Sequence, residues 1–161
     1  MKRVLAVSMI LAVSSTFAKP VNLPTYCKPD NYRFYDKQVV LKMPKYHAND
    51  AAIWLVYNQS TQPIWLVHPT AHHGASAGWS SYLTAGHWTA VMVGHPQFTL
   101  ACHLKDQPLQ PQDCQSLLTI CQLTTVAIPT QAKGTYWLAE DLSLPALQRQ
   151  LQQRGIQLPT P

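Results

Sequence analysis

Acidic side chains are scarce in this sequence of 161 residues, which holds seven Asp and Glu against twelve Lys and Arg. Glu140 and Asp141 are adjacent, and neighbouring side chains on a strand point to opposite faces of the sheet. The sequence therefore gives no support for the paired carboxylates of a glycoside hydrolase. The basic residues are scattered along the chain, so nucleic-acid binding is not indicated either.

The sequence also lacks an apolar stretch of the length that crosses a membrane. The N-terminal apolar run, residues 4–13, is shorter than the roughly 20 residues that a spanning helix needs. Lys2 and Arg3 precede this run, and small residues up to Ala18 follow it. This pattern predicts a signal peptide over residues 1–18 and an exported chain, periplasmic or secreted, with no transmembrane anchor in its mature part.

The four cysteines are not spaced as zinc ligands, because no two of them have the close spacing of a zinc-binding pair. An even number of cysteines in an exported chain predicts two disulfides, and four cysteines allow three pairings that the sequence does not separate. We favour Cys102 with Cys114, which closes a loop rich in Gln and Pro, and Cys27 with Cys121, which fastens the N-terminal segment.

Short apolar runs separated by turn residues dominate the middle of the chain. Two of them, Ile53–Val56 and Ile64–Val67, have the same sequence, and the polar segment between them predicts a β-hairpin. With Tyr57 opposite Ile64, the tryptophans of both runs would share one face of the sheet. Further strands are predicted at residues 79–83, 87–93, 98–103, 115–128 and 135–139. We therefore expect a mainly β fold, an antiparallel β-sandwich or open barrel.

The segment before these strands has a different composition. Prolines interrupt residues 19–50, which predicts an irregular N-terminal arm with strand character only at residues 37–42. Residues 104–113, with two prolines and several glutamines, predict a surface loop. We expect one domain, in which the arm joins the β-rich part over residues 51–161.

Near the C-terminus the spacing of apolar residues changes from the alternation of a strand to that of a helix face, which predicts a helix. Ser143 can cap its start, and the apolar stripe consists of Leu144, Leu147 and Leu151. Gly155 suits the left-handed position just past the end of the helix. We expect this helix to dock on its own domain.

Residues 74–78 read Gly-Ala-Ser-Ala-Gly and match the serine-hydrolase motif G-x-S-x-G. That motif needs a strand that turns into a helix beneath the serine, but here a loop precedes it and a predicted strand follows. We interpret the segment as a turn of small residues and predict no catalytic residue. The polar side chains in and beside it are candidates for a binding loop: His68, His72, His73 and Ser76.

Seven histidines are many for a chain of this length, and neutral imidazole binds copper, zinc or nickel. A metal site needs three or four converging ligands, and the sequence contains no HExxH motif. We therefore predict no metal site and no cofactor.

The order and spacing of several motifs resemble one known family. The motifs are Asn58-Gln59-Ser60, His68-Pro69, Ser76-Ala77-Gly78-Trp79-Ser80-Ser81-x-Leu83, Gly86-x-Trp88-x-Ala90, Phe98-x-Leu100-x-Cys102, Tyr136-Trp137-x-Ala139-Glu140 and Arg154-Gly155-Ile156. Over residues 52–156 the chain resembles the enhanced entry protein EnhB family, which consists of exported proteins of intracellular bacterial pathogens. The resemblance implies an accessory factor linked to uptake by host cells, and it supplies no catalytic residues.

Together these observations predict a non-enzymatic binding protein. Its expected partner is an envelope or host-surface protein or glycan. Two alternatives stay open at this point. One is a cell-envelope hydrolase that acts on peptidoglycan or esters through Ser76 and the histidines, and the other is a periplasmic metal-binding protein.

Overall fold

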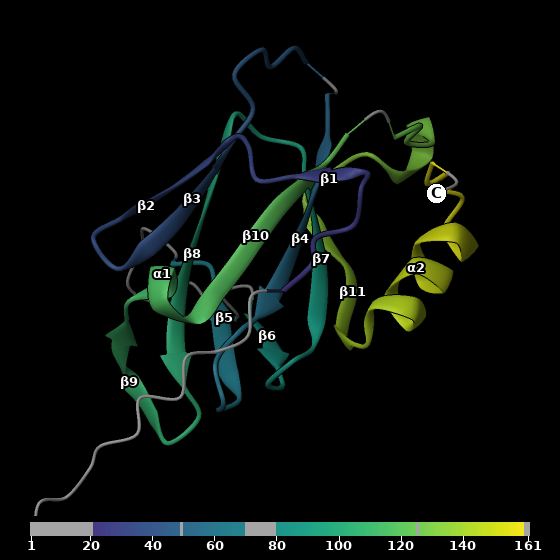
Figure 1. Ribbon diagram of the computed structural model, residues 1–161. Coiled ribbons are helices and arrows are strands. Elements are labelled where there is room, and N and C mark those ends of the chain that lie inside the picture. The colour runs from purple at the N-terminus through teal and green to yellow at the C-terminus, as the bar shows by residue number, and fades with distance from the viewer. Residues whose placement is uncertain (1–20, 49, 70–79, 125, 160–161) are drawn as a thin grey trace, which may run out of the picture.

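Two antiparallel sheets pack against each other in the computed structural model, which describes residues 21–48, 50–69, 80–124 and 126–159 (Figure 1). The first sheet contains, in spatial order, β1 (Cys27–Lys28), β10 (Leu118–Leu123), β4 (Ala52–Asn58), β7 (Trp88–Val93) and β11 (Tyr136–Leu142). The second contains β2 (Tyr32–Tyr35), β3 (Gln38–Lys42), β8 (Gln97–Leu104), β5 (Ile64–Val67) and β6 (Ser80–Leu83), and β9 (Gln107–Gln112) pairs with β8. This arrangement confirms the predicted mainly β, sandwich-like fold.

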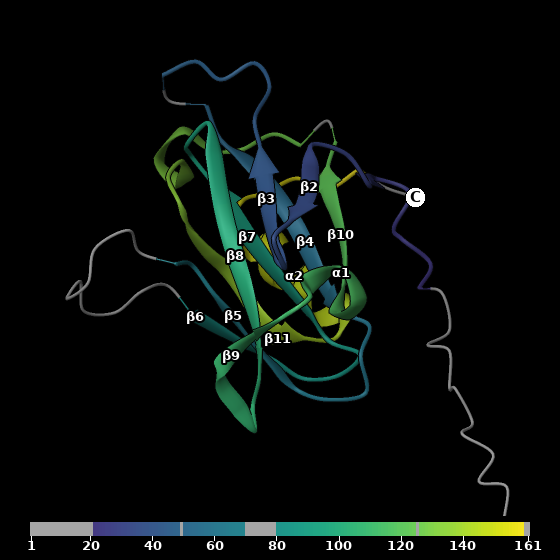
Figure 2. The same cartoon turned by 90° about the vertical axis from the view of Figure 1, so that its left-hand side faces the viewer.

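The main core fills the space between the two sheets. Its buried side chains come from both sheets and from α1 (Cys114–Leu117), and they include Trp54, Leu41, Ile64, Leu66, Leu83, Leu100 and Ile120. Turned to face the second sheet, the molecule shows β3 and β8 in front of β4 and β7, with α2 (Leu144–Gln153) behind them (Figure 2).

A second core lies on the other face of the first sheet, where α2 packs against β11 and β7. Side chains from both faces of β4 and β7 are therefore buried, and every residue of β7 is buried. A strand that is covered on both faces reads as a continuous apolar run, whereas a strand with one open face alternates. β4 is covered on both faces and β5 has one open face, although both contain the tetrapeptide Ile-Trp-Leu-Val, so the apolar pattern does not distinguish the two strands.

The predicted hairpin between those runs is wrong. β4 pairs with β10 and β7, whereas β5 pairs with β6 and β8, so the two strands belong to different sheets. Asn58 fixes the corner between them, because its buried amide nitrogen donates to the carbonyls of Gln62 at 2.8 Å and Leu83 at 2.9 Å. Its Oδ1 accepts from the backbone nitrogen of Ser60 at 3.0 Å. The polar segment therefore carries the chain from one sheet to the other.

The irregular arm predicted over residues 19–50 needs a partial correction. The strand expected at 37–42 is present as β3, but β2 precedes it and pairs with it as a hairpin. Asp36 and Lys37 form the turn with φ of 47° and 64°, the two positive values that a tight hairpin of this twist requires. No glycine marks this turn, so the sequence gives little sign of it.

Two other predicted segments differ from the structure. The expected surface loop at 104–113 contains β9, which adds to the edge of β8. The long strand expected at 115–128 begins instead as α1, because the Asp113 side chain accepts a hydrogen bond from the backbone nitrogen of Gln115 at 3.0 Å and caps a helical turn. The strand itself is limited to β10.

The C-terminal helix is confirmed. Gly155 has φ of +78°, and its nitrogen donates to the carbonyl of Gln152 at 2.9 Å. The nitrogen of Ile156 donates to the carbonyl of Leu151 at 3.1 Å, which completes a Schellman motif with both side chains buried. Ser143 occupies the N-cap position, but its side chain makes no capping hydrogen bond.

Both predicted disulfides are confirmed, Cys27 with Cys121 and Cys102 with Cys114. Two disulfides in a small domain indicate an oxidising compartment. Within the described ranges, no helix has the length and apolar character that a membrane span requires. The expected signal peptide at residues 1–18 lies outside the described residues.

Candidate functional site

Of the four binding-loop candidates, the structure describes only His68. Its ring stacks on Phe98 with centroids 4.3 Å apart and an interplanar angle of 12°. Its Nδ1 donates to the backbone carbonyl of Thr99 at 2.7 Å. These contacts hold His68 against β8. The other candidates, His72, His73 and Ser76, lie outside the described residues, as do the whole G-x-S-x-G segment and the start of the strand expected at 79–83.

A row of ring side chains crosses the outer face of the second sheet. Trp65 on β5 lies opposite Tyr82 on β6 and opposite His103 on β8. The rings of Trp65 and Tyr82 meet edge to face, with centroids 5.1 Å apart and planes at 64°. We call Tyr82, Trp65 and His103 the ring row.

The alternation along β5 decides which way the ring row faces. Ile64 and Leu66 are fully buried in the main core, so Trp65 between them points away from it. Trp65 is 37% exposed, whereas Trp54, the equivalent residue in the run Ile53–Val56 on β4, is completely buried. An indole on the open side of a sheet is a large apolar surface that the core does not use.

His103 closes one end of the ring row and has a polar atom without a partner. Its Nδ1 is enclosed and makes no hydrogen bond with any residue that the structure describes. Pro111 of β9 lies opposite it on the next strand. A buried ring nitrogen without a partner is costly in a folded protein, so it marks a place where a ligand group gains a hydrogen bond.

The face around the ring row has no formal charge when histidine is neutral. By strand alternation, the outward positions of β5, β6 and β8 are Trp65, Val67, Ser80, Tyr82, Gln97, Thr99, Ala101 and His103. These side chains combine ring surface, small apolar groups and neutral hydrogen-bonding groups. Such a face is suited to a neutral ligand that offers both apolar surface and hydrogen-bonding groups.

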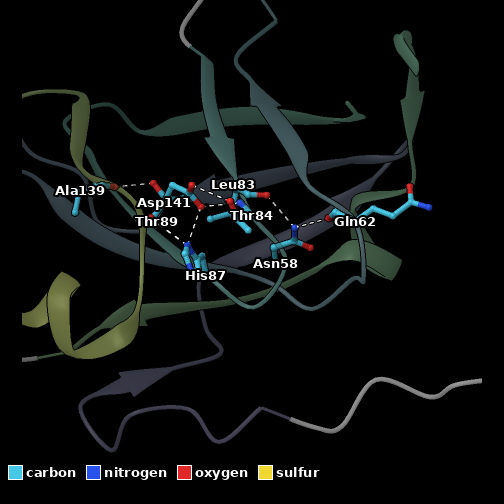
Figure 3. Close-up of polar contacts among 8 residues, drawn as sticks. All are labelled: Asn58, Gln62, Leu83, Thr84, His87, Thr89, Ala139 and Asp141. Carbon is cyan, nitrogen blue, oxygen red and sulfur yellow. Dashed lines mark hydrogen bonds and ion pairs between the residues drawn. The ribbon is translucent and has the colours of Figure 1, made fainter. Parts of the chain in front are cut away.

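A second cluster, of polar groups, lies at the end of the sandwich where β6, β7 and β11 meet (Figure 3). Asp141 accepts hydrogen bonds from the backbone nitrogen of Thr84 at 2.7 Å and from its hydroxyl at 2.8 Å. The Nδ1 of His87 lies 3.0 Å from the same carboxylate. Asp141 has φ of +51° within the register shift between Ala139 and Leu142 of β11, and this backbone turns its side chain towards the β6–β7 turn.

The polar cluster contains one element of catalytic chemistry. A carboxylate bonded to Nδ1 of a histidine orients the imidazole, as in hydrolase triads, and His87 is 39% exposed. Both carboxylate oxygens are also bonded to Thr84, whose hydroxyl donates to Asp141 and is therefore not paired with His87. Thr89 adds a bond to the carbonyl of Ala139 at 2.6 Å. These contacts join the β6–β7 turn to β11, which is a structural role.

Among the described residues, two grooves away from these clusters contain charged side chains. One, of about 470 Å³, has Met43, Val126 and Ile128 in its wall together with Lys45, Lys133 and Asp50. The backbone nitrogen of His47 donates to the carboxylate of Asp50 at 2.8 Å and lowers the pKa of Asp50. The other, of about 560 Å³, separates α2 from the segment around Tyr26. Neither groove gathers groups that could carry out a reaction together.

Sequence analysis did not identify the ring row or the His87–Asp141 pair. Trp65 resembles a core residue in sequence, and His87 and Asp141 are far apart in the chain. Strand pairing alone brings each group together. Within the described ranges, no three His, Cys, Asp or Glu side chains are grouped as metal ligands.

Comparison with known proteins does not assign this chain to a family. No family model matches the chain, and no curated protein or solved structure matches it.

Proposed function

We propose that this chain is an exported, non-enzymatic binding protein whose binding surface is the ring row, Tyr82, Trp65 and His103. The observation that supports it best is the exposure of Trp65, 37%, on a strand whose inward side chains are completely buried. Tryptophan is enriched among the residues that contribute most to binding, because it offers a large, rigid contact area.

The surroundings of the ring row suit it to recognition. Trp65 lies on a strand that is hydrogen-bonded on both sides, so its backbone is fixed before any ligand binds. The Cys102–Cys114 disulfide, next to His103 in sequence, ties β8 to α1. A surface held in this way loses little conformational entropy on binding.

The place of action is part of the same proposal. Two disulfides favour an oxidising compartment, so the partner belongs to the bacterial envelope or to the surface of a host cell. The motif resemblance to the EnhB family supports a role as an accessory factor in uptake by host cells.

Binding of the labelled, oxidised chain to envelope preparations and to intact host cells tests the proposal. We expect saturable binding to at least one of them, and a loss of at least tenfold in affinity in Trp65→Ala. Tyr35→Ala is the matched control, because Tyr35 is 67% exposed on β2 and outside the ring row. Equal binding by the Trp65→Ala variant would show that the ring row is not the binding surface.

The His87–Asp141 pair favours a second candidate function, a cell-envelope hydrolase. In that function Asp141 orients the imidazole and His87 acts as the base that activates a nucleophile, with Ser76 as the candidate from the sequence. Turnover of peptidoglycan or model esters that is abolished in both His87→Ala and Ser76→Ala would support it. Absence of turnover by the unmodified protein, or turnover that survives both substitutions, would exclude it.

A further inference from the structure

We infer that the ligand of the ring row is an uncharged, β-linked glycan, whose sugar rings stack on Trp65 and Tyr82. The inference rests on the proposed binding function and names the chemistry of its ligand. Four properties of the face lead to it: its lack of charge, its small area of exposed ring, the arrangement of its rings and the unpartnered nitrogen of His103.

The lack of charge excludes most other ligand classes. Among the described residues, the outward positions of β5, β6 and β8 carry no Asp, Glu, Lys or Arg. Nucleic acids, anionic lipids and sulfated glycans are recognised mainly through basic side chains, and basic peptides through acidic ones. A neutral ligand is the best match to a neutral face.

The exposed ring surface alone is small beside a typical protein interface. A buried aromatic side chain covers about 150–250 Å², and Trp65 and Tyr82 are each already more than half buried. The remaining ring surface is therefore far below the roughly 800 Å² that each partner contributes to a stable protein interface. It is comparable to the area of one or two sugar rings.

The arrangement of the rings matches the shape of a glycan chain. Neighbouring strands lie about 4.8 Å apart, so the members of the ring row follow one another at a spacing similar to the repeat of an extended β-linked chain. The apolar C–H face of a pyranose packs on an aromatic ring. The ring planes of Trp65 and Tyr82 meet at 64°, so the two side chains form an angled apolar surface on which such a ring can pack.

His103 provides the polar contact that a sugar needs. A sugar ring carries hydroxyl groups around its edge, and these either donate to or accept from an imidazole nitrogen. The Nδ1 of His103 has no partner among the described residues and lies in the strand next to Trp65. Because this atom is enclosed, the His103 side chain has to turn before a sugar hydroxyl can bond to it.

Calorimetric titration of the oxidised full chain tests the inference. The probes are neutral β-1,4-linked tetrasaccharides of glucose and of N-acetylglucosamine, the α-linked glucose tetrasaccharide and a sulfated heparin fragment. We expect saturable binding of at least one β-linked neutral probe, with weaker binding of the α-linked probe and of the heparin fragment. Because the contact area is small, we expect a Kd between about 10 µM and 1 mM.

Variants locate the binding on the ring row. Trp65→Ala should weaken it at least tenfold, Trp65→Phe should retain most of it because a ring remains, and His103→Ala should weaken it severalfold. Tyr35→Ala should leave the affinity unchanged. Circular dichroism checks that each variant is folded, and the loss expected in His103→Ala keeps the test valid if Trp65→Ala does not fold.

The outcomes separate this inference from the proposed function. If no neutral β-linked glycan binds, or if such binding survives Trp65→Ala in a folded protein, the glycan inference is wrong. If a protein of the envelope or host surface instead binds in a manner that depends on Trp65, the glycan inference fails but the binding function stands. If neither kind of binding depends on Trp65, both fail.

Discussion

Asp141 holds Thr84 by two hydrogen bonds, because each carboxylate oxygen accepts one from Thr84, and so fixes the β6–β7 turn to a bulged part of β11. The same carboxylate lies within hydrogen-bonding distance of Nδ1 of His87. Three donors converge on this side chain from a segment more than 50 residues away in sequence. The contact between the two segments therefore depends on one charged group.

Asp141→Asn should lower the free energy of unfolding by about 1.5 to 3 kcal/mol, because hydrogen bonds to a charged group contribute that amount. Asparagine also adopts positive φ, so the substitution removes the charge and keeps the backbone. Urea unfolding followed by circular dichroism measures the change.

Glu140→Gln is the control for this prediction. Glu140 precedes Asp141 and is exposed, so its change should stay within about 0.5 kcal/mol. A loss in Asp141→Asn no larger than that of Glu140→Gln would contradict the structural role of the carboxylate.

Asn58→Ala should destabilise the fold by about 2 to 3 kcal/mol. The substitution leaves the buried carbonyl of Leu83 without its donor and the nitrogen of Ser60 without its acceptor. Buried groups left in this state cost about 1 to 3 kcal/mol each. Chemical unfolding provides the measurement. Gln62→Ala keeps the carbonyl that Asn58 uses and removes only an exposed side chain, so it should have little effect.

The two disulfides should contribute unequally. The Cys27–Cys121 bond closes a loop with a sequence separation of 94, and the Cys102–Cys114 bond one of 12. Loop-closure entropy predicts about 4.7 kcal/mol for a loop near 100 residues and about 3 kcal/mol for one near 15. Unfolding of the two double-alanine variants measures these losses. A larger loss from the short loop would mean that native-state contacts outweigh chain entropy here.

Tyr32→Phe should increase resistance to alkaline unfolding. Burial raises the pKa of Tyr32 above its usual value near 10. The unfolded chain has the usual pKa near 10, so as the pH rises it loses the tyrosine proton before the folded chain does. The contribution of Tyr32 to stability is therefore present below about pH 10 and is lost as the pH rises through the raised pKa of the folded state. Phenylalanine removes this loss.

The midpoint of alkaline unfolding, followed by circular dichroism, tests this expectation. Tyr35→Phe is the matched control, because Tyr35 is 67% exposed and its hydroxyl is already in solvent. If Tyr32→Phe and Tyr35→Phe unfold at the same pH, burial of Tyr32 has no role in the alkaline transition.

Local signals in the sequence were sufficient for some of the fold. β7 follows a clear apolar run, and α2 has a leucine stripe and a glycine just past its end, so both were predicted close to their observed bounds. The Cys102–Cys114 disulfide was also predicted correctly, because these two cysteines are close in sequence and close a polar loop. These features depend on residues that are near one another in the chain.

Other features depend on partners far along the chain. Residues 53–56 and 64–67 are identical in sequence, yet Trp54 faces the main core between the sheets and Trp65 faces the uncovered side of the second sheet. The exposure of Trp65 follows from that difference, so no local pattern predicts it. The His87–Asp141 pair likewise depends on a register shift in β11, which its sequence does not reveal.

The order of the cysteines has a consequence for biogenesis. The first cysteine pairs with the last, and the bond between the second and third is nested inside that pair. A chain that emerges from its N-terminus and is oxidised as it appears would join Cys27 to Cys102 first, which is a non-native bond. The native set therefore requires either that β10 folds beside β1 before oxidation or that an isomerase reshuffles the early bond by thiol exchange.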